Sequence, residues 1–541
     1  MSYRPWLSQY DDGVPHSLIY PDVCVHDLLI RIECDKKSRI AIEIGKNQIT
    51  YAELDEKSTN FAKHSIDLGV KQGEIAGLCL PNSIEFVIAF FGILKAGGVV
   101  AAMNPAFPKR ELQFQVASTG LKVVVTNNEK IEDFISMTGD TGLNHLVIAG
   151  EYQHTGALEK QGLHHFEEFT RELNQSARLP KMLPSDPAVV QFSGGTTGTP
   201  KAALGSHQNL VANATQFRSW LVNLEGGKET FLIAIPLYHV YGLVLGLILG
   251  VATAARMVFV KQPGNVDEIL TAVKQYPISY FPAVPSIFTR INQHPDVVNK
   301  RITLSTIKAC ISGSAPLLDS IRQEFESNTG GFLVEGYGLS EAPTATHCNP
   351  ILGQKRSGSI GLPLPDVDCK IVSLTGEAKE VDMGKEGELW IRGPQVMLGY
   401  LNNTVVNKIV FQDRWLRTGD IARMDSEGYF YLSGRIKDLI KVHGMQVWPN
   451  EVEEVLSLHP AVMECASAGI PDETSGERVK IWVVLHPGVT LTLPEVIDFC
   501  RDKLAGYKIP AQLEIRDCLP RTPMGKVLRR ILVEEHGRTK K

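Results

Sequence analysis

Short apolar runs alternate with longer apolar or amphipathic stretches along most of the chain. One such unit consists of the run Gly77–Leu80, the stretch Ile84–Leu94 and a second run, Val99–Ala102. Short strand-like runs that alternate with helical patterns are typical of α/β architecture. The pattern therefore predicts a large N-terminal domain built of several layers of β-sheet and helix.

The pattern changes near Gly434. Beyond it we expect a helix over Asn450–Leu458, acidic on its outer face, and a strand over Val479–Leu485. About a hundred residues are enough for a small α+β domain with its own core. We place the boundary inside the polar run Ser433–Asp438, which divides the chain into an N-terminal domain (1–434) and a C-terminal domain (435–541).

One uncharged segment, Val240–Ala255, raises the question of a membrane span. A spanning helix needs about 20 apolar residues, and Arg256 ends this segment earlier. We therefore expect a buried core helix. The first residues contain no apolar stretch of the kind that a signal peptide has.

Composition and charge narrow the class of protein. The chain has 541 residues, of which 43% are hydrophobic and 21% charged, which fits a globular protein and excludes disordered, collagen-like and coiled-coil classes. With 55 Lys and Arg against 60 Asp and Glu, the net charge of −5 does not favour nucleic acid as a partner. The nine cysteines include no C-x-x-C pair, which favours reduced thiols and a cytoplasmic protein.

The segment Phe192–Lys201 is the first candidate for chemistry. Its glycines permit positive φ and leave backbone N–H groups accessible, and its hydroxyls add donors, so the loop is suited to phosphate oxygens. It is not a Walker A loop, because Lys201 follows Pro200 where that pattern requires glycine. Taken alone, the segment also fits a surface turn rich in Gly and Thr.

Several competing motifs are missing from the sequence. Gly336–Gly338 is the only G-x-G and lacks the third glycine of a dinucleotide-binding loop. No G-x-S-x-G and no H-E-x-x-H occurs, so neither a serine hydrolase nor a zincin is indicated.

Further segments complete an ordered set with the phosphate loop. They are Ser312–Leu317, Glu335–Glu341, Trp415–Asp420, Gly434–Lys441 and Leu519–Lys526. In this order and spacing they resemble the adenylate-forming superfamily of acyl-CoA synthetases, adenylation domains and luciferases, over nearly the whole chain. The double glycine Gly194-Gly195 resembles the branch of fatty-acid–CoA ligases, although Ala202 replaces the glycine that normally follows the loop lysine.

This resemblance implies an enzyme that uses ATP, Mg²⁺ and CoA. Lys526 would bridge the attacking carboxylate and the α-phosphate, where a compact charge suits developing negative charge. Glu341 would bind Mg²⁺, which prefers carboxylate oxygen and water, and Ser340 would contact the α-phosphate. The remaining nucleotide-binding residues implied by the resemblance are Ser193, Gly194, Gly195, Thr196, Thr197, Gly198 and Lys201 for the β- and γ-phosphates, Gly313, Ser314, Ala315, Gly336, Tyr337 and Gly338 around adenine, and Asp420 with Arg435 at the ribose.

The resemblance also implies two half-reactions in one site. Lys526 acts in adenylation and must then leave, so the C-terminal domain is expected to rotate about a hinge at Lys437. The rotation would bring Lys441 and Gly444 to the site for thioester formation. Hinges are a few residues that absorb a large φ/ψ change, and an exposed domain boundary suits them.

The acyl pocket implied by the resemblance includes His239, Gly242 and Val284. None of these carries a formal charge, and an unpaired buried charge is very unfavourable. We therefore expect an apolar monocarboxylate, a medium- or long-chain fatty acid, as the substrate.

Other readings remain open at this point. An aryl or cyclic carboxylic acid would differ only in pocket shape, and an adenylating enzyme could load a carrier protein instead of CoA. A non-catalytic nucleotide sensor is disfavoured, because it would need neither Glu341 nor Lys526. The sequence leaves open whether the protein is a monomer or a homodimer, and whether it touches a membrane surface.

Overall fold

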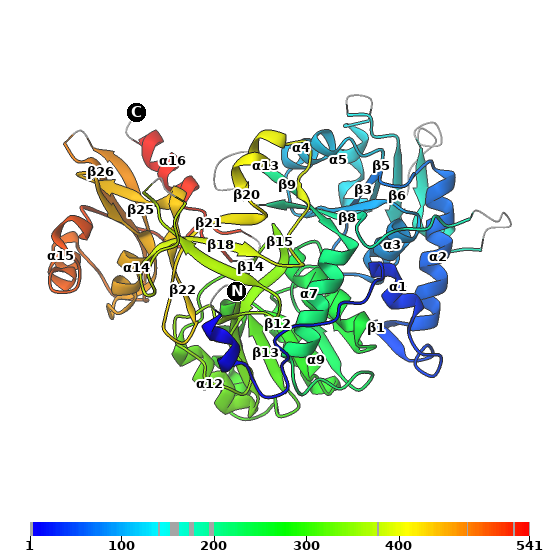
Figure 1. The fold of residues 1–541 in the computed structure, drawn as a ribbon, viewed down its shortest axis with the longest axis horizontal. Helices are drawn as coiled ribbons and strands as arrows, with labels where there is room; N and C mark the ends of the chain where they lie inside the picture. Colours follow the sequence, from blue (N-terminus) through cyan, green and yellow to red (C-terminus); the bar gives the residue numbers. More distant parts are fainter. Residues whose placement is uncertain are drawn as a thin grey trace.

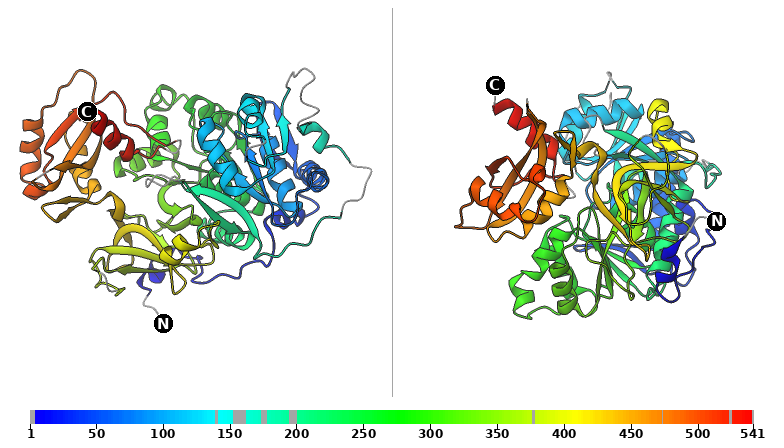
Figure 2. Two further views of the ribbon diagram at one scale, coloured as in Figure 1. Left: turned by 90° about the horizontal axis from the view of Figure 1, so that it is seen from above. Right: turned by 60° about the vertical axis from the view of Figure 1, so that its left-hand side comes forward.

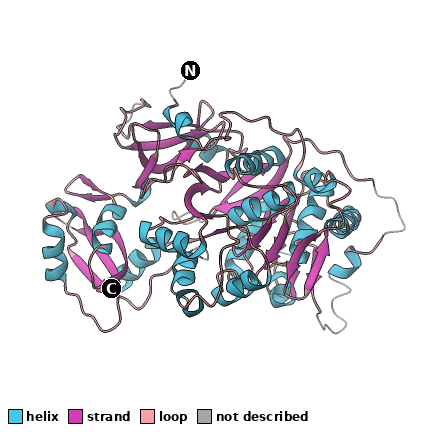
Figure 3. Cartoon of the chain, turned by 90° about the horizontal axis from the view of Figure 1, so that it is seen from below, coloured by secondary structure: helices cyan, strands magenta, loops and turns pink. Residues whose placement is uncertain are grey.

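A computed structural model describes residues 4–138, 141–151, 162–172, 178–193, 200–375, 378–472, 474–522 and 525–539. The chain forms a large lobe and a smaller C-terminal lobe that stands beside it (Figures 1 and 2). In the large lobe, helices flank the strands of the sheets (Figure 3). This is the mixed α/β architecture that the sequence predicts.

The first sheet of the large lobe has eight strands in the order β19-β9-β8-β4-β3-β5-β6-β7. Its parallel part contains the predicted unit of β3 (Ile75–Cys79), α3 (Ile84–Lys95) and β4 (Val99–Ala102). The other strands are β5 (Val123–Asn127), β6 (His145–Ala149), β7 (Leu163–His165), β8 (Pro187–Ser193), β9 (Lys201–Ser206) and β19 (Gly399–Tyr400). Because β8 and β9 are antiparallel and Ser193 pairs with Lys201, the predicted phosphate loop connects these two strands.

The second sheet has nine strands in the order β16-β15-β14-β13-β12-β10-β11-β1-β2. Its strands are β1 (Ile40–Ile44), β2 (Asn47–Thr50), β10 (Thr230–Ile233), β11 (Arg256–Phe259), β12 (Tyr280–Ala283), β13 (Ala309–Ser312), β14 (Phe332–Leu339), β15 (Ala342–Cys348) and β16 (Leu362–Pro363). The central strands from β1 to β14 run parallel, and β14 turns back antiparallel into β15.

Helices of the large lobe connect and cover these sheets. They are η1 (Pro5–Gln9), α1 (Val25–Ile30), α2 (Tyr51–Asp67), α4 (Lys109–Thr119), η2 (Asn128–Lys130), α5 (Ile131–Ile135), α6 (Phe166–Phe169), α7 (His207–Trp220), α9 (Val266–Gln275), α10 (Pro285–Asn292), α11 (Pro295–Val298), α12 (Asp319–Thr329) and α13 (Thr404–Val410). Helix α7 begins where the Ser206 side chain accepts a hydrogen bond from the backbone N–H of Asn209, a standard N-terminal cap.

The uncharged segment after Val240 is a buried helix, as predicted. It consists of the π-helical turn η3 (Gly242–Ile248) and α8 (Leu249–Ala252). Two of its glycines are required by packing, because a Cβ on Gly242 would lie 2.3 Å from the carbonyl oxygen of Pro236 and one on Gly250 would lie 2.6 Å from the sulfur of Met257. Among the described residues, no helix combines the length and the apolar character that crossing a membrane requires.

A third sheet joins the large lobe to the C-terminal lobe. It consists of β17 (Asp368–Val372), β18 (Gly387–Arg392), β20 (Phe411–Gln412), β21 (Trp415–Met424) and β22 (Phe430–Arg435). Strands β21 and β22 are antiparallel and pair Asp420 with Arg435. This pairing places two predicted nucleotide-binding residues side by side, just before the chain enters the C-terminal lobe.

The C-terminal lobe has its own sheet and its own buried clusters of apolar side chains. The short helix η4 (Ile436–Asp438) leads into β23 (Ile440–Val442), β24 (Met445–Val447), β25 (Val462–Asp472), β26 (Gly476–Leu485) and β27 (Gln512–Ile515). Its helices are α14 (Pro449–Ser457), α15 (Leu493–Arg501), η5 (Gly506–Lys508) and α16 (Arg529–Thr539). The helix expected from Asn450 is α14, and the strand expected from Val479 lies within β26.

Candidate active site

A cavity of about 1270 Å³ lies where the three sheets of the large lobe meet the C-terminal lobe. Most of the motifs singled out in the sequence reach it. From the predicted set, the residues that line it are Lys201, His239, Gly313, Ser314, Gly336, Tyr337, Gly338, Ser340, Glu341, Arg435, Lys437 and Lys526. Segments separated by more than 300 residues therefore share one site.

The β14–β15 hairpin presents residues 336–341, most of one motif, to this cavity. Its glycine at Gly338 is required by close packing, because an added Cβ would lie 1.7 Å from the carbonyl oxygen of Thr344. No neighbouring side chain could make room, since the obstacle is backbone. The hairpin therefore carries Tyr337 on β14 and turns at Ser340 and Glu341, with all three residues on the cavity wall.

Asp420 lies beneath the cavity surface in a network of charged and polar groups. The Tyr337 hydroxyl donates to its Oδ2 at 2.6 Å, and Arg435 Nε lies 2.7 Å from its Oδ1. Burial and the Asp420 charge raise the pKa of Tyr337, so its hydroxyl stays a donor. Arg435 faces the cavity whereas Asp420 is only 3% exposed and does not line it. In this structure, Asp420 orients Tyr337 and Arg435.

The loop after β13 forms the opposite side of the predicted adenine site. Gly313 and Ser314 line the cavity, while Ala315 does not. The loop is held by Glu335, whose Oε2 accepts a hydrogen bond from the backbone N–H of Leu317 at 3.1 Å. Burial raises the pKa of Glu335 to about 8. Glu335 belongs to a predicted motif, but its hold on this loop is visible only in the fold.

Lys526 enters the cavity from the C-terminal lobe. Its backbone N–H donates to Thr522 Oγ1 at 3.1 Å, which fixes the turn that carries it. Burial lowers the pKa of the Lys526 ammonium to about 8; the positive charge of Arg435 acts in the same direction, and the negative charges of Asp420 and Asp438 oppose it. Burial also lowers the pKa of Lys437. Two lysines of weakened basicity thus face the same cavity, next to Arg435.

Glu341 is oriented by a tyrosine that sequence analysis did not find. The hydroxyl of Tyr400, on β19, donates to Glu341 Oε1 at 2.7 Å, and the Lys201 ammonium lies 5.3 Å from the centre of the Tyr400 ring. The second carboxylate oxygen of Glu341 remains for a ligand, which fits a hard divalent cation held partly by phosphates. Tyr400 belongs to none of the segments singled out in the sequence, and the fold brings it next to Glu341.

Most of the residues predicted to form the phosphate loop lie outside the part of the chain that the structure describes. Gly194, Gly195, Thr196, Thr197 and Gly198 fall in the undescribed segment 194–199, and the side chain of Ser193 is likewise not described. Lys201 marks the end of the loop and lines the cavity.

One buried part of the cavity wall is largely apolar. It consists of Phe217 of α7, Tyr241, Leu245 of η3, Ile311 of β13 and Ala345 of β15. Of these side chains, only Tyr241 carries a polar group, and its hydroxyl donates to the carbonyl oxygen of Ile311 at 2.7 Å. These five side chains therefore form an apolar part of the cavity wall that suits an acyl group.

Of the three residues predicted for the acyl pocket, one lines the cavity and two do not. His239 lines the cavity, and burial lowers the pKa of its imidazole to about 4, so it is neutral at pH 7. Gly242 and Val284 do not line it, contrary to expectation. Gly242 packs against the backbone of Pro236, and Val284 is buried in the core at the start of α10. Phe217 and Leu245 contribute instead, and neither belongs to a motif.

Lys441 and Gly444 lie apart from the other predicted site residues. They belong to the β23–β24 hairpin, both are exposed, and neither lines the cavity. In this arrangement of the lobes, the cavity contains Lys526 and excludes the hairpin.

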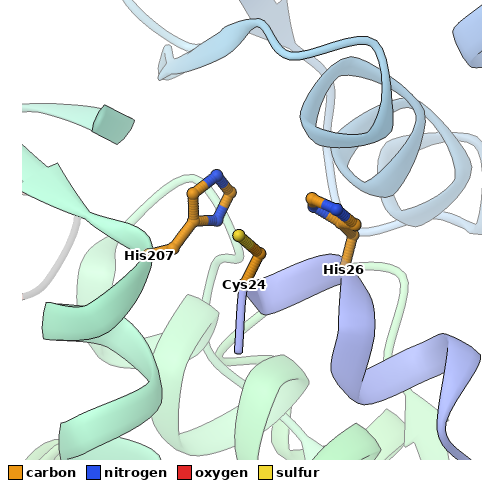
Figure 4. A group of neighbouring side chains, drawn as sticks. All are labelled: Cys24, His26 and His207. Atoms are coloured by element: carbon orange, nitrogen blue, oxygen red, sulfur yellow. The ribbon is translucent and has the colours of Figure 1, made fainter. Parts of the chain in front are cut away.

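A second group of potential ligands lies outside this cavity. Cys24, His26 and His207 are buried, with potential ligand atoms within 4.8 Å of one another (Figure 4). However, the backbone N–H of Val25 donates to His207 Nδ1 at 3.2 Å, which directs a positive dipole at the nitrogen that faces Cys24. Histidine ligands of metals normally have the opposite polarity, with the second nitrogen donating outward. We therefore assign this group to the core.

Together, the fold and the site define a two-lobed enzyme of the nucleotide-dependent kind, in which the smaller lobe contributes a lysine, Lys526, to the cavity. The chain belongs to the adenylate-forming superfamily: the family described as AMP-binding enzyme matches residues 33–401, and the AMP-binding enzyme C-terminal domain matches residues 451–526. Its relatives and structural neighbours make it an acid–thiol ligase that forms AMP.

Individual relatives and solved structures are similar to this chain over nearly its whole length. The long-chain-fatty-acid–CoA ligase of Bacillus subtilis is 35% identical, with 99% of this chain and 98% of the relative covered. Among solved structures, ATP-bound MatB from Rhodopseudomonas palustris is 26% identical, covers 96% of this chain and 100% of its own, and superposes with a TM-score of 0.86. Apo MatB, with the same identity and coverage, gives a TM-score of 0.75.

Proposed function

We propose that this protein is an ATP- and Mg²⁺-dependent fatty-acid–CoA ligase that acts on medium- or long-chain acids. It activates the carboxylate as acyl-AMP with release of pyrophosphate and then transfers the acyl group to CoA. The observation that carries the choice of acid is the apolar, buried part of the cavity wall that includes Phe217, Leu245 and Ile311. A second carboxylate or an ammonium group there would be buried without a partner.

In the first half-reaction, the substrate carboxylate attacks the α-phosphate. Both groups are negative, so the site must supply positive charge where they meet. Lys526, which lines the cavity, would supply it, and Lys201 would meet the outer phosphates. Glu341 would hold Mg²⁺ through its free oxygen, and the ion would offset charge on the phosphates.

Ser340 precedes Glu341 and also lines the cavity, and the resemblance implies that it would contact the α-phosphate. Tyr337 and the Gly313–Ser314 backbone would hold adenine between them. Asp420 would act at the ribose together with Arg435, which it already orients.

In the second half-reaction, a thiol must reach the acyl carbon that Lys526 now shields. We propose that the C-terminal lobe turns about Lys437, in η4, and exchanges Lys526 for the Lys441–Gly444 hairpin. One observation supports this: Lys526 lines the cavity while the hairpin does not.

The experiment that tests the function is product analysis with Mg-ATP, CoA and a panel of acids. The panel contains short, medium and long saturated acids, aryl acids and dicarboxylic acids. We expect AMP and a single class of fatty acyl-CoA to rise together. An aryl-CoA product would overturn the choice of acid. Acyl-AMP without any CoA ester would identify a carrier-loading enzyme instead.

A further inference from the structure

Tyr400 lies on a segment that is bonded to two parts of the site. The segment 397–401 contains β19 and pairs with the edge of β9 that β8 does not occupy. Strand β9 itself begins directly after the phosphate loop. The backbone N–H of Leu398 donates to the carbonyl oxygen of Leu204 at 2.8 Å, and that of Leu401 to Ala202 at 2.8 Å. The N–H of Met397 donates to the carbonyl oxygen of Glu341 at 2.9 Å. The segment thus ties the end of the phosphate loop to the turn that carries Glu341.

The side chain of Tyr400 repeats this connection. Its hydroxyl donates to Glu341 Oε1 at 2.7 Å, and its ring lies 5.3 Å from the Lys201 ammonium. The Tyr400 side chain therefore contacts both Glu341 and Lys201, the two residues assigned to the metal and to the outer phosphates.

The backbone of Tyr400 is fixed from the outer side. Its N–H donates to Asn407 Oδ1 at 2.7 Å, and Asn407 Nδ2 donates back to its carbonyl oxygen at 2.9 Å. The preceding Gly399 has a φ of +142°, and a Cβ there would lie 3.0 Å from Asn407 Nδ2. Because its backbone is bonded on both sides, Tyr400 is anchored before any ligand arrives.

We propose that Tyr400 is a positioning residue for the metal–triphosphate. Its hydroxyl occupies one oxygen of Glu341 and aims the other at the cation, and its ring holds Lys201 beside the same phosphates. The proposal rests on the proposed function, since it assigns Glu341 to Mg²⁺. It adds a residue that belongs to none of the motifs.

The test is the binding of ligands to Tyr400→Phe, measured by calorimetry. The two probes are AMP without metal and a non-hydrolysable ATP analogue with Mg²⁺. Loss of a hydrogen bond to a charged group should weaken binding of the Mg²⁺–analogue complex roughly tenfold to a hundredfold and leave AMP binding unchanged. Tyr400→Leu, which also removes the ring from Lys201, should weaken the complex further. A melting curve on each variant confirms that it is folded.

The matched control is Tyr276→Phe. The Tyr276 hydroxyl donates to Glu43 Oε1 at the same distance, 2.7 Å, but neither residue lines the cavity. It should change neither affinity. Unchanged binding in Tyr400→Phe, or equal loss for AMP and for the Mg²⁺–analogue complex, would overturn the positioning role. Failure of the unaltered protein to bind the Mg²⁺–analogue complex would instead overturn the proposed function.

Discussion

Truncation of Leu245 should lengthen the fatty acid that the enzyme prefers. Leu245 and Ile311 line the active-site cavity, and both also line a separate cavity of about 10 Å³. The other walls of the small cavity are apolar and include Leu221, Phe231 and Leu249. The Leu245 side chain therefore forms part of the partition between the two spaces.

The magnitude follows from the atoms removed. Leu245→Ala deletes three carbon atoms and joins the cavities, which gives room for two or three more methylene groups of substrate. At about 0.8 kcal/mol for each buried methylene, kcat/KM for the longer acid should gain roughly 15- to 60-fold relative to the original optimum. The free protein should lose about 2–5 kcal/mol of stability, because a buried leucine is replaced by a void.

The assay is kcat/KM for a series of saturated acids from eight to eighteen carbons, measured on both proteins. Leu243→Ala is the matched control, since Leu243 is also buried in η3 but lines neither cavity. It should lower stability without moving the optimum. An unchanged optimum in folded Leu245→Ala, or an equal loss with every acid, would refute the reasoning.

Three further predictions concern the lysines and the hairpin. Burial lowers the pKa of Lys526 to about 8, so its positive charge is lost as pH rises through that value. The rate of pyrophosphate release should therefore fall above about pH 8, and Lys526→Arg should remove this fall. A rate that climbs through the same pH range would contradict the role of the Lys526 charge. Lys437→Pro should spare acyl-adenylate formation or thioester formation but not both, measured by separate single-turnover assays, and equal loss of the two would exclude the hinge. Gly338→Ala should destabilise the protein by about 3 kcal/mol or more, because the added Cβ would lie 1.7 Å from a backbone oxygen. Gly506→Ala, which has open space around it, should leave the melting temperature nearly unchanged. Equal melting temperatures for the two variants would show that the hairpin backbone can shift to accommodate the added Cβ.

Local motifs singled out many of the described residues that line the cavity. The Glu335–Glu341 segment combines glycines that a tight hairpin requires with a carboxylate at the turn, and both properties are readable from neighbouring residues. Lys526 was found in the same way. The helix at Val240 was also predicted correctly, because its length and its apolar character are local properties. Its π-helical first turn carries no such local signal.

The sequence by itself determined the class of fold, the order of the motifs and the chemistry that the resemblance implies, since each of these depends on residues close together in the chain. Only the tertiary structure decided which residues meet. Phe217, Leu245 and Ile311 line one cavity from three different elements, whereas Gly242 does not line it and packs against the backbone carbonyl of Pro236. Tyr400 reaches Glu341 across 59 positions of sequence because β19 pairs with β9. Such contacts depend on packing between distant segments, for which a single sequence has no periodic or local signal.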